Sequence, residues 1–140
     1  MSNPTATAHR RNKMKAIVII AIAIVAIVAV FGISYLVRVN NYQSYVSSLA
    51  IGNPPIQHLA DGVYEGACDA DIIGATVSVS VANGRIVDVD ILEHRTERGQ
   101  AAEVIADSIV KEQRVDIDAV SGATNSSKVI QKAVENALSQ

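Results

Sequence analysis

Residues 77–91 read VSVSVANGRIVDVDI and carry the strongest local structural signal in the chain. Valine alternates with serine over positions 77–81, and valine or isoleucine alternates with aspartate over 87–91. Asn83-Gly84 stands between them, a pair favoured in two-residue hairpin turns because both positions need a positive φ. The pattern predicts an antiparallel hairpin with one apolar face and one solvent-facing side.

The segments around this hairpin complete a small domain. Residues 62–66 (GVYEG) predict a further short strand beside it, and residues 100–113 and 125–138 have the apolar periodicity of helices. Two helices with apolar stripes and a one-faced sheet predict a two-layer α+β fold with an antiparallel, hairpin-based sheet. The expected stripes are Ala101, Ile105 and Ile109, with Ala102, Ala106 and Val110 alongside, and Val129, Ile130, Ala133, Val134, Ala137 and Leu138.

An apolar run without charge precedes the domain, from Ala16 to Val37. It is long enough to cross a hydrocarbon core of about 30 Å as a helix. A cleaved signal peptide is the alternative, but its apolar region usually spans only about 7–15 residues. We therefore expect a cytoplasmic basic tail (1–15), a transmembrane helix (16–37), a linker or spacer (38–60) and a folded domain (61–140). Four basic residues precede the run, which predicts a single-pass protein of the cell membrane with its domain extracytoplasmic.

Charge and cysteine content exclude several classes of function. Residues 61–140 hold seven basic and fourteen acidic residues, a net charge of −7. Such a domain is not expected to bind nucleic acid, which requires phosphate neutralisation. The single cysteine, Cys68, allows no internal disulfide, and the sequence has no Cys/His spacing typical of a metal site. We expect Cys68 to be a small, buried or partly buried side chain.

The segment DAVSGAT, residues 118–124, is the candidate functional motif. It places the hydroxyl of Thr124 after a flexible Ser-Gly-Ala step and directly before a predicted helix. The N-terminus of a helix presents free N–H groups and a positive dipole end, so it suits a phosphate. A loop with an ordinary helix cap is the alternative, since Ser, Thr and Gly are common there.

The exposed domain resembles the small FMN-binding domain family. That family includes the C subunit of the sodium-pumping NADH:quinone oxidoreductase, the G subunit of Rnf-type complexes, and single-domain membrane-anchored extracytoplasmic flavoproteins. The resemblance is carried by Gly62-Val63-Tyr64-Glu65-Gly66, Asn83-Gly84-Arg85-Ile86, Ile91-Leu92-Glu93-His94 and Asp118 to Ser127.

The resemblance implies that Thr124 carries FMN through a phosphoester bond. A separate flavin transferase installs this FMN and recognises Asp118 together with the small residues of the motif. The cofactor-binding residues implied are Thr124, Ser121, Gly122, Ala123, Asn125, Ser126 and Ser127. The backbone N–H groups of residues 125–127 are expected to receive the phosphate, while the two serine hydroxyls either add donors or cap the helix.

The environment of the isoalloxazine ring is less defined. The domain has one aromatic residue, Tyr64, so aliphatic side chains and backbone are expected to cover one side of the ring and leave an edge exposed. Residues expected to line the flavin are Tyr64, His94, Arg98 and Gly99. A solvated basic loop is the alternative for the last three.

Electron transfer between redox partners in or outside the membrane is the expected function, since the cofactor carries the chemistry. The sequence shows no paired acid and base for a substrate pocket, and no catalytic residue is assigned. Two alternatives remain: an accessory subunit that feeds electrons to a separate reductase, and a membrane-tethered binding or sensing module without redox turnover.

Overall fold

The computed structural model describes residues 4–140, with side chains from residue 12 onward. The expected basic tail therefore begins outside the described residues. The chain forms two units, residues 1–37 and residues 38–140, and each is described by itself. The long helix α1, Pro4–Ser48, continues from the first into the second.

From Pro4 onward the first unit is helical, and the side chains described in it, from Asn12, are exposed to solvent. The helix segment Asn12–Ser48 has an 18-residue window of mean hydropathy 3.3, none of it buried. By length and composition this helix is able to cross a membrane, which is compatible with the expected anchor over residues 16–37.

The second unit contains a three-stranded antiparallel sheet in the order β1-β2-β3. Its strands are β1 (Gly62–Ala70), β2 (Ile73–Ala82) and β3 (Arg85–Arg95). Asn83 and Gly84 have φ values of 51° and 68°, as the predicted hairpin turn requires.

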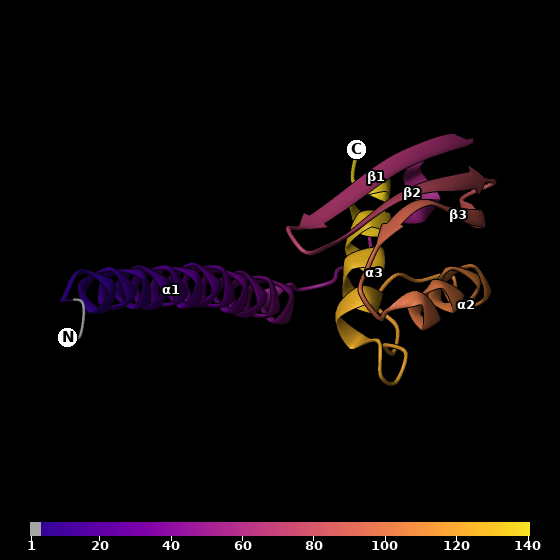
Figure 1. The fold of residues 1–140 in the computed structure, drawn as a ribbon. Coiled ribbons are helices and arrows are strands. Elements are labelled where there is room, and N and C mark those ends of the chain that lie inside the picture. Colours follow the sequence, from indigo (N-terminus) through magenta and orange to yellow (C-terminus); the bar gives the residue numbers. More distant parts are fainter. Residues whose placement is uncertain (1–3) are drawn as a thin grey trace. The chain divides into compact units, whose positions relative to one another are not determined.

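Helices cover one face of this sheet, with α3 packed across β1 and β2 and α2 packed against β3 (Figure 1). The helical elements after α1 are η1 (Ile56–His58), η2 (Gln100–Val104), α2 (Ile105–Glu112) and α3 (Thr124–Leu138). The predicted α+β class, with a long apolar helix preceding the domain, is confirmed.

One detail of the predicted hairpin is wrong. Val87 was expected on the apolar face, but it is 52% exposed, and Ile86 is buried instead. The cause is a register shift between Ser80 and Val81 on β2, where β3 carries an extra residue. Because side chains alternate with period two, one extra residue moves the next side chain to the other face.

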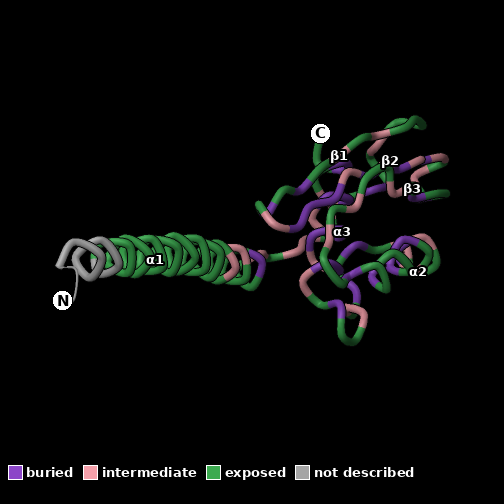
Figure 2. Tube along the Cα trace, viewed as in Figure 1, coloured by how far each residue is buried: buried purple, intermediate pink, exposed green. Residues whose placement is uncertain are grey.

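The core lies between the sheet and α3, whose buried residues are visible along the helix in Figure 2. All six residues of the predicted α3 stripe are buried, so that prediction is confirmed. The helix lies very close to β1: a Cβ on Gly66 would stand 2.2 Å from the carbonyl oxygen of Ala133. A glycine is required there because the backbone of α3 packs directly against that of β1.

The helix predicted over residues 100–113 is divided. Its first turn is the 3-10 helix η2, and the α-helical part is α2. Ala101 is exposed rather than part of the buried stripe, whereas Ala102, Ile105 and Ile109 are buried. A tighter first turn rotates its side chains relative to those of the following α-helix.

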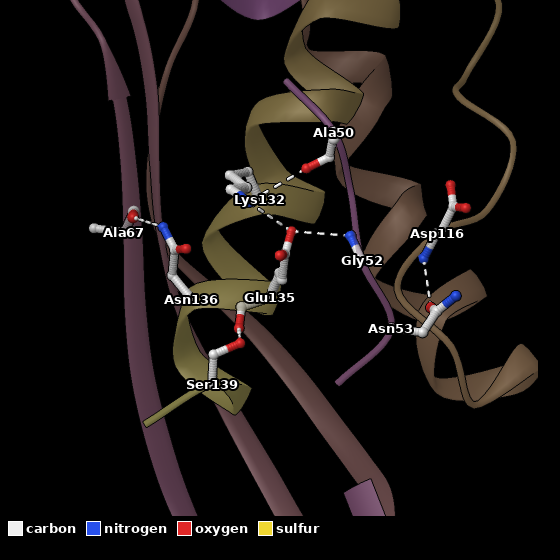
Figure 3. A network of polar contacts seen from close by, with 9 residues as sticks. All are labelled: Ala50, Gly52, Asn53, Ala67, Asp116, Lys132, Glu135, Asn136 and Ser139. Atoms are coloured by element: carbon white, nitrogen blue, oxygen red, sulfur yellow. Dashed lines mark hydrogen bonds and ion pairs between the residues drawn. The ribbon is translucent and has the colours of Figure 1, made fainter. Parts of the chain in front are cut away.

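Residues 38–60, expected as a spacer, lie within the second unit and give Val46 and Ile56 to its core. Polar contacts also hold this segment. The Gly52 N–H donates to a carboxylate oxygen of Glu135 at 3.1 Å, and the Lys132 ammonium donates to the Ala50 carbonyl at 3.3 Å (Figure 3).

Candidate functional site

The loop that carries the motif is held at its start by two amide side chains. The Asn53 side-chain oxygen accepts the N–H groups of Val115 and Asp116 at 2.8 and 2.9 Å, the second drawn in Figure 3. From α3, the buried Gln131 amide donates to the carbonyls of Val115 and Ile117 at 3.0 and 2.7 Å. The loop is thereby fixed before it reaches the motif.

The motif itself makes a tight turn at Ser121-Gly122. The Ala123 N–H donates to the Val120 carbonyl at 3.0 Å, and Gly122 has a φ of 80°. A positive φ at the third position is the requirement of a type II turn and favours glycine. Ser121 and Gly122 are exposed, and no atom lies within 4 Å of where a Gly122 Cβ would stand.

Thr124 is the first residue of α3 and its side chain is exposed. The N-cap is Ala123, which is buried and makes no side-chain hydrogen bond to the helix. Serine, threonine, aspartate or asparagine is the usual choice at an N-cap, and alanine there costs about 1 kcal/mol. The helix therefore begins without a protein side chain on its first N–H groups.

The start of α3 shows that one of the N–H groups predicted to receive the phosphate is not free. The Ser127 N–H already donates to the Ala123 carbonyl at 2.9 Å, so it is the first intrahelical bond and not a free group. The groups that precede it are the N–H of Thr124, Asn125 and Ser126. The helix begins one residue earlier than the sequence indicated, and this shifts the set of available donors by one.

The hydroxyls of Ser126 and Ser127 hold the site together. Ser127 Oγ accepts the Val120 N–H and donates to the Ala123 carbonyl, both at 3.0 Å. Ser126 Oγ lies 3.1 Å from Thr96 Oγ1, which also accepts the Gly99 N–H at 2.8 Å. Both serines are buried, so their hydroxyls fix the turn and the first helical turn in place.

These contacts join the exit of β3 to the N-terminus of α3 in one corner, formed by residues 94–103 and 123–127. Gly99 is buried in it, and a Cβ there would stand 1.9 Å from Ser126 Oγ. Arg98 is exposed beside it. His94 is in β3, paired with Ala75 of β2, rather than beyond the strand as the sequence indicated.

His94 has the most unusual environment in the corner. Its side chain is 3% exposed, and Nδ1 lies 3.0 Å from a carboxylate oxygen of Glu103 in η2. Its Nε2 is buried without a hydrogen-bond partner among the described residues. A buried polar atom is normally paired, so such an exception calls for an explanation.

Tyr64 lies apart from this corner. The Tyr64 hydroxyl donates to the Ala60 carbonyl at 2.8 Å at the start of β1. The next residues of β1 meet the C-terminal part of the chain, since the Gln140 amide donates to the Glu65 carbonyl. The structure therefore brings His94, Arg98 and Gly99 near the start of α3 but not Tyr64. Asp118 is exposed in the loop before the turn.

Four residues of the site were not predicted from the sequence: Asn53, Thr96, Glu103 and Gln131. Thr96 had a weak signal, because it follows His94 closely in the chain. Asn53 and Gln131 contact the loop across 14 to 63 positions, whereas Glu103 contacts His94 across nine. Nothing in the local sequence marks any of these three.

Cys68 is buried, as predicted. Burial raises the pKa of its thiol, while contact with Tyr45 acts in the opposite direction. Among the residues that the structure describes, no group of three His, Cys, Asp or Glu side chains is arranged to hold a metal ion.

Fold and site together define a small α+β domain with an exposed threonine at an uncapped helix N-terminus, preceded by a helix able to span a membrane. Residues 71–139 match the FMN-binding domain family, and this part of the chain belongs to it. The match starts after β1 and includes the whole corner and the motif. It supports FMN binding by this domain.

A relative is an uncharacterised protein of Treponema pallidum (strain Nichols), 34% identical over 85 residues. The match covers 59% of this chain and 24% of that protein, so the matched part is about a quarter of the relative.

The residues at the start of α3 fit the phosphate of FMN. The available N–H groups, the helix dipole and the missing side-chain cap all favour an anion at this point. The unpaired Nε2 of His94 adds a second sign that the corner accommodates a polar group that the protein does not itself supply.

Proposed function

We propose that this protein is a membrane-anchored extracytoplasmic flavoprotein, with FMN attached to Thr124 by a phosphoester bond, that transfers electrons between redox partners. The observation that carries the proposal is the exposed Thr124 hydroxyl at the uncapped N-terminus of α3, within a domain of the FMN-binding family.

The chain's own residues have distinct roles in this proposal. Thr124 supplies the oxygen of the ester, and the N–H groups of Thr124, Asn125 and Ser126 face the phosphate with the positive end of the α3 dipole. Gly122 gives the turn its positive φ, and Ser127 holds that turn on the helix. FMN supplies the redox chemistry when bound.

Maturation requires a flavin transferase, which breaks the pyrophosphate bond of FAD, joins the FMN phosphorus to the Thr124 oxygen and releases AMP with the hydroxyl proton. The site is accessible to such an enzyme. Asp118, Ser121, Gly122 and Thr124 are all exposed on one loop and the first residue of the helix. Ala123 is buried and sets the spacing between the turn and Thr124. The exposed side chains are the surface that a transferase reads in this proposal.

The proposed location follows from the anchor. Basic residues precede the apolar helix, which favours a cytoplasmic N-terminus and an external domain. A covalent bond suits that side of the membrane because a dissociated cofactor would be lost.

The test is mass spectrometry of the denatured full-length chain after co-expression with a flavin transferase. The mass of the parent is expected to increase by that of one FMN minus one water molecule. Thr124→Ala is expected to show no increase, and Thr124→Ser a detectable fraction of loaded protein because it keeps a hydroxyl. Thr76→Ala, a half-buried threonine of β2, is the matched control and is expected to load fully.

FMN that survives denaturation on Thr124→Ala would contradict the attachment site. Loaded protein that cannot be reduced and reoxidised would contradict electron transfer and favour a binding or sensing module instead.

A further inference from the structure

His94 is the one buried group in the corner whose hydrogen bonding is incomplete. Nδ1 contacts the Glu103 carboxylate at 3.0 Å, whereas Nε2 has no partner among the described residues. An ionised carboxylate only accepts hydrogen bonds, so the contact places the ring proton on Nδ1. In the neutral ring, Nε2 is then a buried lone pair that lacks a donor.

The Nε2 lone pair of His94 and the side chain of Thr124 belong to the same corner of the domain. His94 is opposite Ala75, a core residue of β2, so its side chain is on the face of the sheet that the helices cover. Two residues later, Thr96 contacts Ser126 in the first turn of α3, two residues after Thr124. A group tethered to Thr124 therefore starts from the same corner.

The chemistry of FMN decides which part of it fits. The phosphate only accepts hydrogen bonds, so it does not satisfy a lone pair, and the nearby Glu103 carboxylate repels it. The pyrimidine edge of the isoalloxazine ring presents a donor, N3–H. Small buried residues stand beside His94 in the fold: Ala75 is opposite it on β2, and Ala102 precedes Glu103, which suits a flat ring.

We propose that His94 Nε2 accepts a hydrogen bond from N3–H of the isoalloxazine ring, with Glu103 as the positioning residue that fixes the tautomer of His94. This inference rests on the proposed attachment of FMN to Thr124 and adds the binding site of the ring's polar edge.

The burial of Nε2 has a structural consequence for this proposal. A ring that reaches the atom displaces part of what covers it. The element that contacts the ring of His94 is η2, through Glu103, and the hydrogen bonds of this 3-10 helix are weaker than those of an α-helix. Flavin loading is therefore expected to change amide hydrogen exchange in residues 100–104.

The experiment uses the full-length chain in detergent, loaded by a flavin transferase with FMN labelled with ¹⁵N at N3. Mass spectrometry first measures attachment, and NMR then measures the N3–H resonance. His94→Leu is expected to shift this resonance and raise flavin fluorescence towards that of free FMN, and Glu103→Ala to act in the same direction. His94→Gln and Glu103→Gln, which keep hydrogen-bonding groups, are expected to remain nearer the parent.

His58→Leu is the control, because His58 is exposed in η1. It is expected to leave the resonance unchanged. Circular dichroism identifies any variant that fails to fold. In that case the two glutamine variants are compared with the parent instead.

The outcomes separate the two proposals. If Thr124 carries no FMN, the proposed function fails and this inference with it. If FMN is attached but His94→Leu and folded His94→Gln both leave the N3–H resonance and the fluorescence as in the parent, the attachment stands and the role of His94 is overturned. The role of His94 is also overturned if His94→Leu leaves the N3–H resonance unchanged and moves only the signals of the ribityl chain.

Discussion

The two ends of α3 use their polar groups in opposite ways. Its C-terminal half is tied into the fold by side chains, as Figure 3 shows. Lys132 donates to Glu135 at 2.8 Å, Asn136 donates to the Ala67 carbonyl at 2.9 Å, and Ser139 donates to the Glu135 carbonyl at 2.7 Å.

At the N-terminal end, Ser126 and Ser127 fix the first turn, but no side chain caps the first N–H groups of the helix. Ala123 offers no cap, and the Thr124 side chain is exposed. A helix normally gains stability from a capping side chain at this position. Local rules of stability are most often broken at functional sites, so the open end is where a ligand is expected and the closed end is where the fold is secured.

The largest expected effect is at the closed end, on Gly66. In Gly66→Ala the new Cβ would stand 2.2 Å from the Ala133 carbonyl oxygen and 2.4 Å from the Ala137 nitrogen, both backbone atoms that cannot turn away. We expect a loss of about 3 kcal/mol in the free energy of unfolding. Urea denaturation of the full chain in detergent, followed by circular dichroism, measures it.

Gly122→Ala is the matched variant at the open end. It meets no atom within 4 Å, and its only cost is the positive φ, about 1 kcal/mol. Equal losses at the two glycines would mean that the ends of α3 do not differ in packing.

Gln131→Leu is expected to have the next largest effect, because it leaves the buried carbonyls of Val115 and Ile117 without their donor. The cost is about 2 kcal/mol. The loop before the motif also loses its hold on α3, so hydrogen exchange over residues 115–123 should accelerate and flavin attachment should slow.

The control for this variant is Gln140→Leu, an exposed amide at the closed end. Its change in stability should stay within about 0.5 kcal/mol. If Gln131→Leu lost stability but attached flavin at the parent rate, the loop would not depend on Gln131 for its position.

Much of the architecture was predictable from periodic patterns. The hairpin around Asn83-Gly84 and the apolar stripe of α3 are local signals, with periods of 2 and 3.6 residues, and the structure confirms both. The exposure of Val87 was not predictable in this way, because the extra residue in β3 appears only when the strands pair.

The candidate site was predictable only in part, for a related reason. Thr124 stands in a local motif that the sequence displays directly. The contact of His94 with Glu103, and those of Asn53 and Gln131 with the loop, join segments that only the tertiary fold brings together. Patterns in one sequence do not report such contacts.

The smallest expected effect is that of Glu135→Gln at the closed end. The Glu135 carboxylate accepts from Gly52 at 3.1 Å and from Lys132 at 2.8 Å, and its side chain is 18% exposed. Glutamine keeps an acceptor but removes the charge, so the free energy of unfolding should fall by about 1 kcal/mol, measured by urea denaturation.

This variant separates stability from function. Glu135 is in the C-terminal half of α3 and secures the segment around Gly52, not the motif, so flavin attachment per folded molecule should equal that of the parent. Ser139→Ala, which removes one exposed hydrogen bond to the same residue, is the control and should cost less. A drop in flavin attachment with Glu135→Gln, but not with Ser139→Ala, would show that the two ends of α3 are coupled. The open N-terminus would then depend on the closed end for more than the stability of the fold.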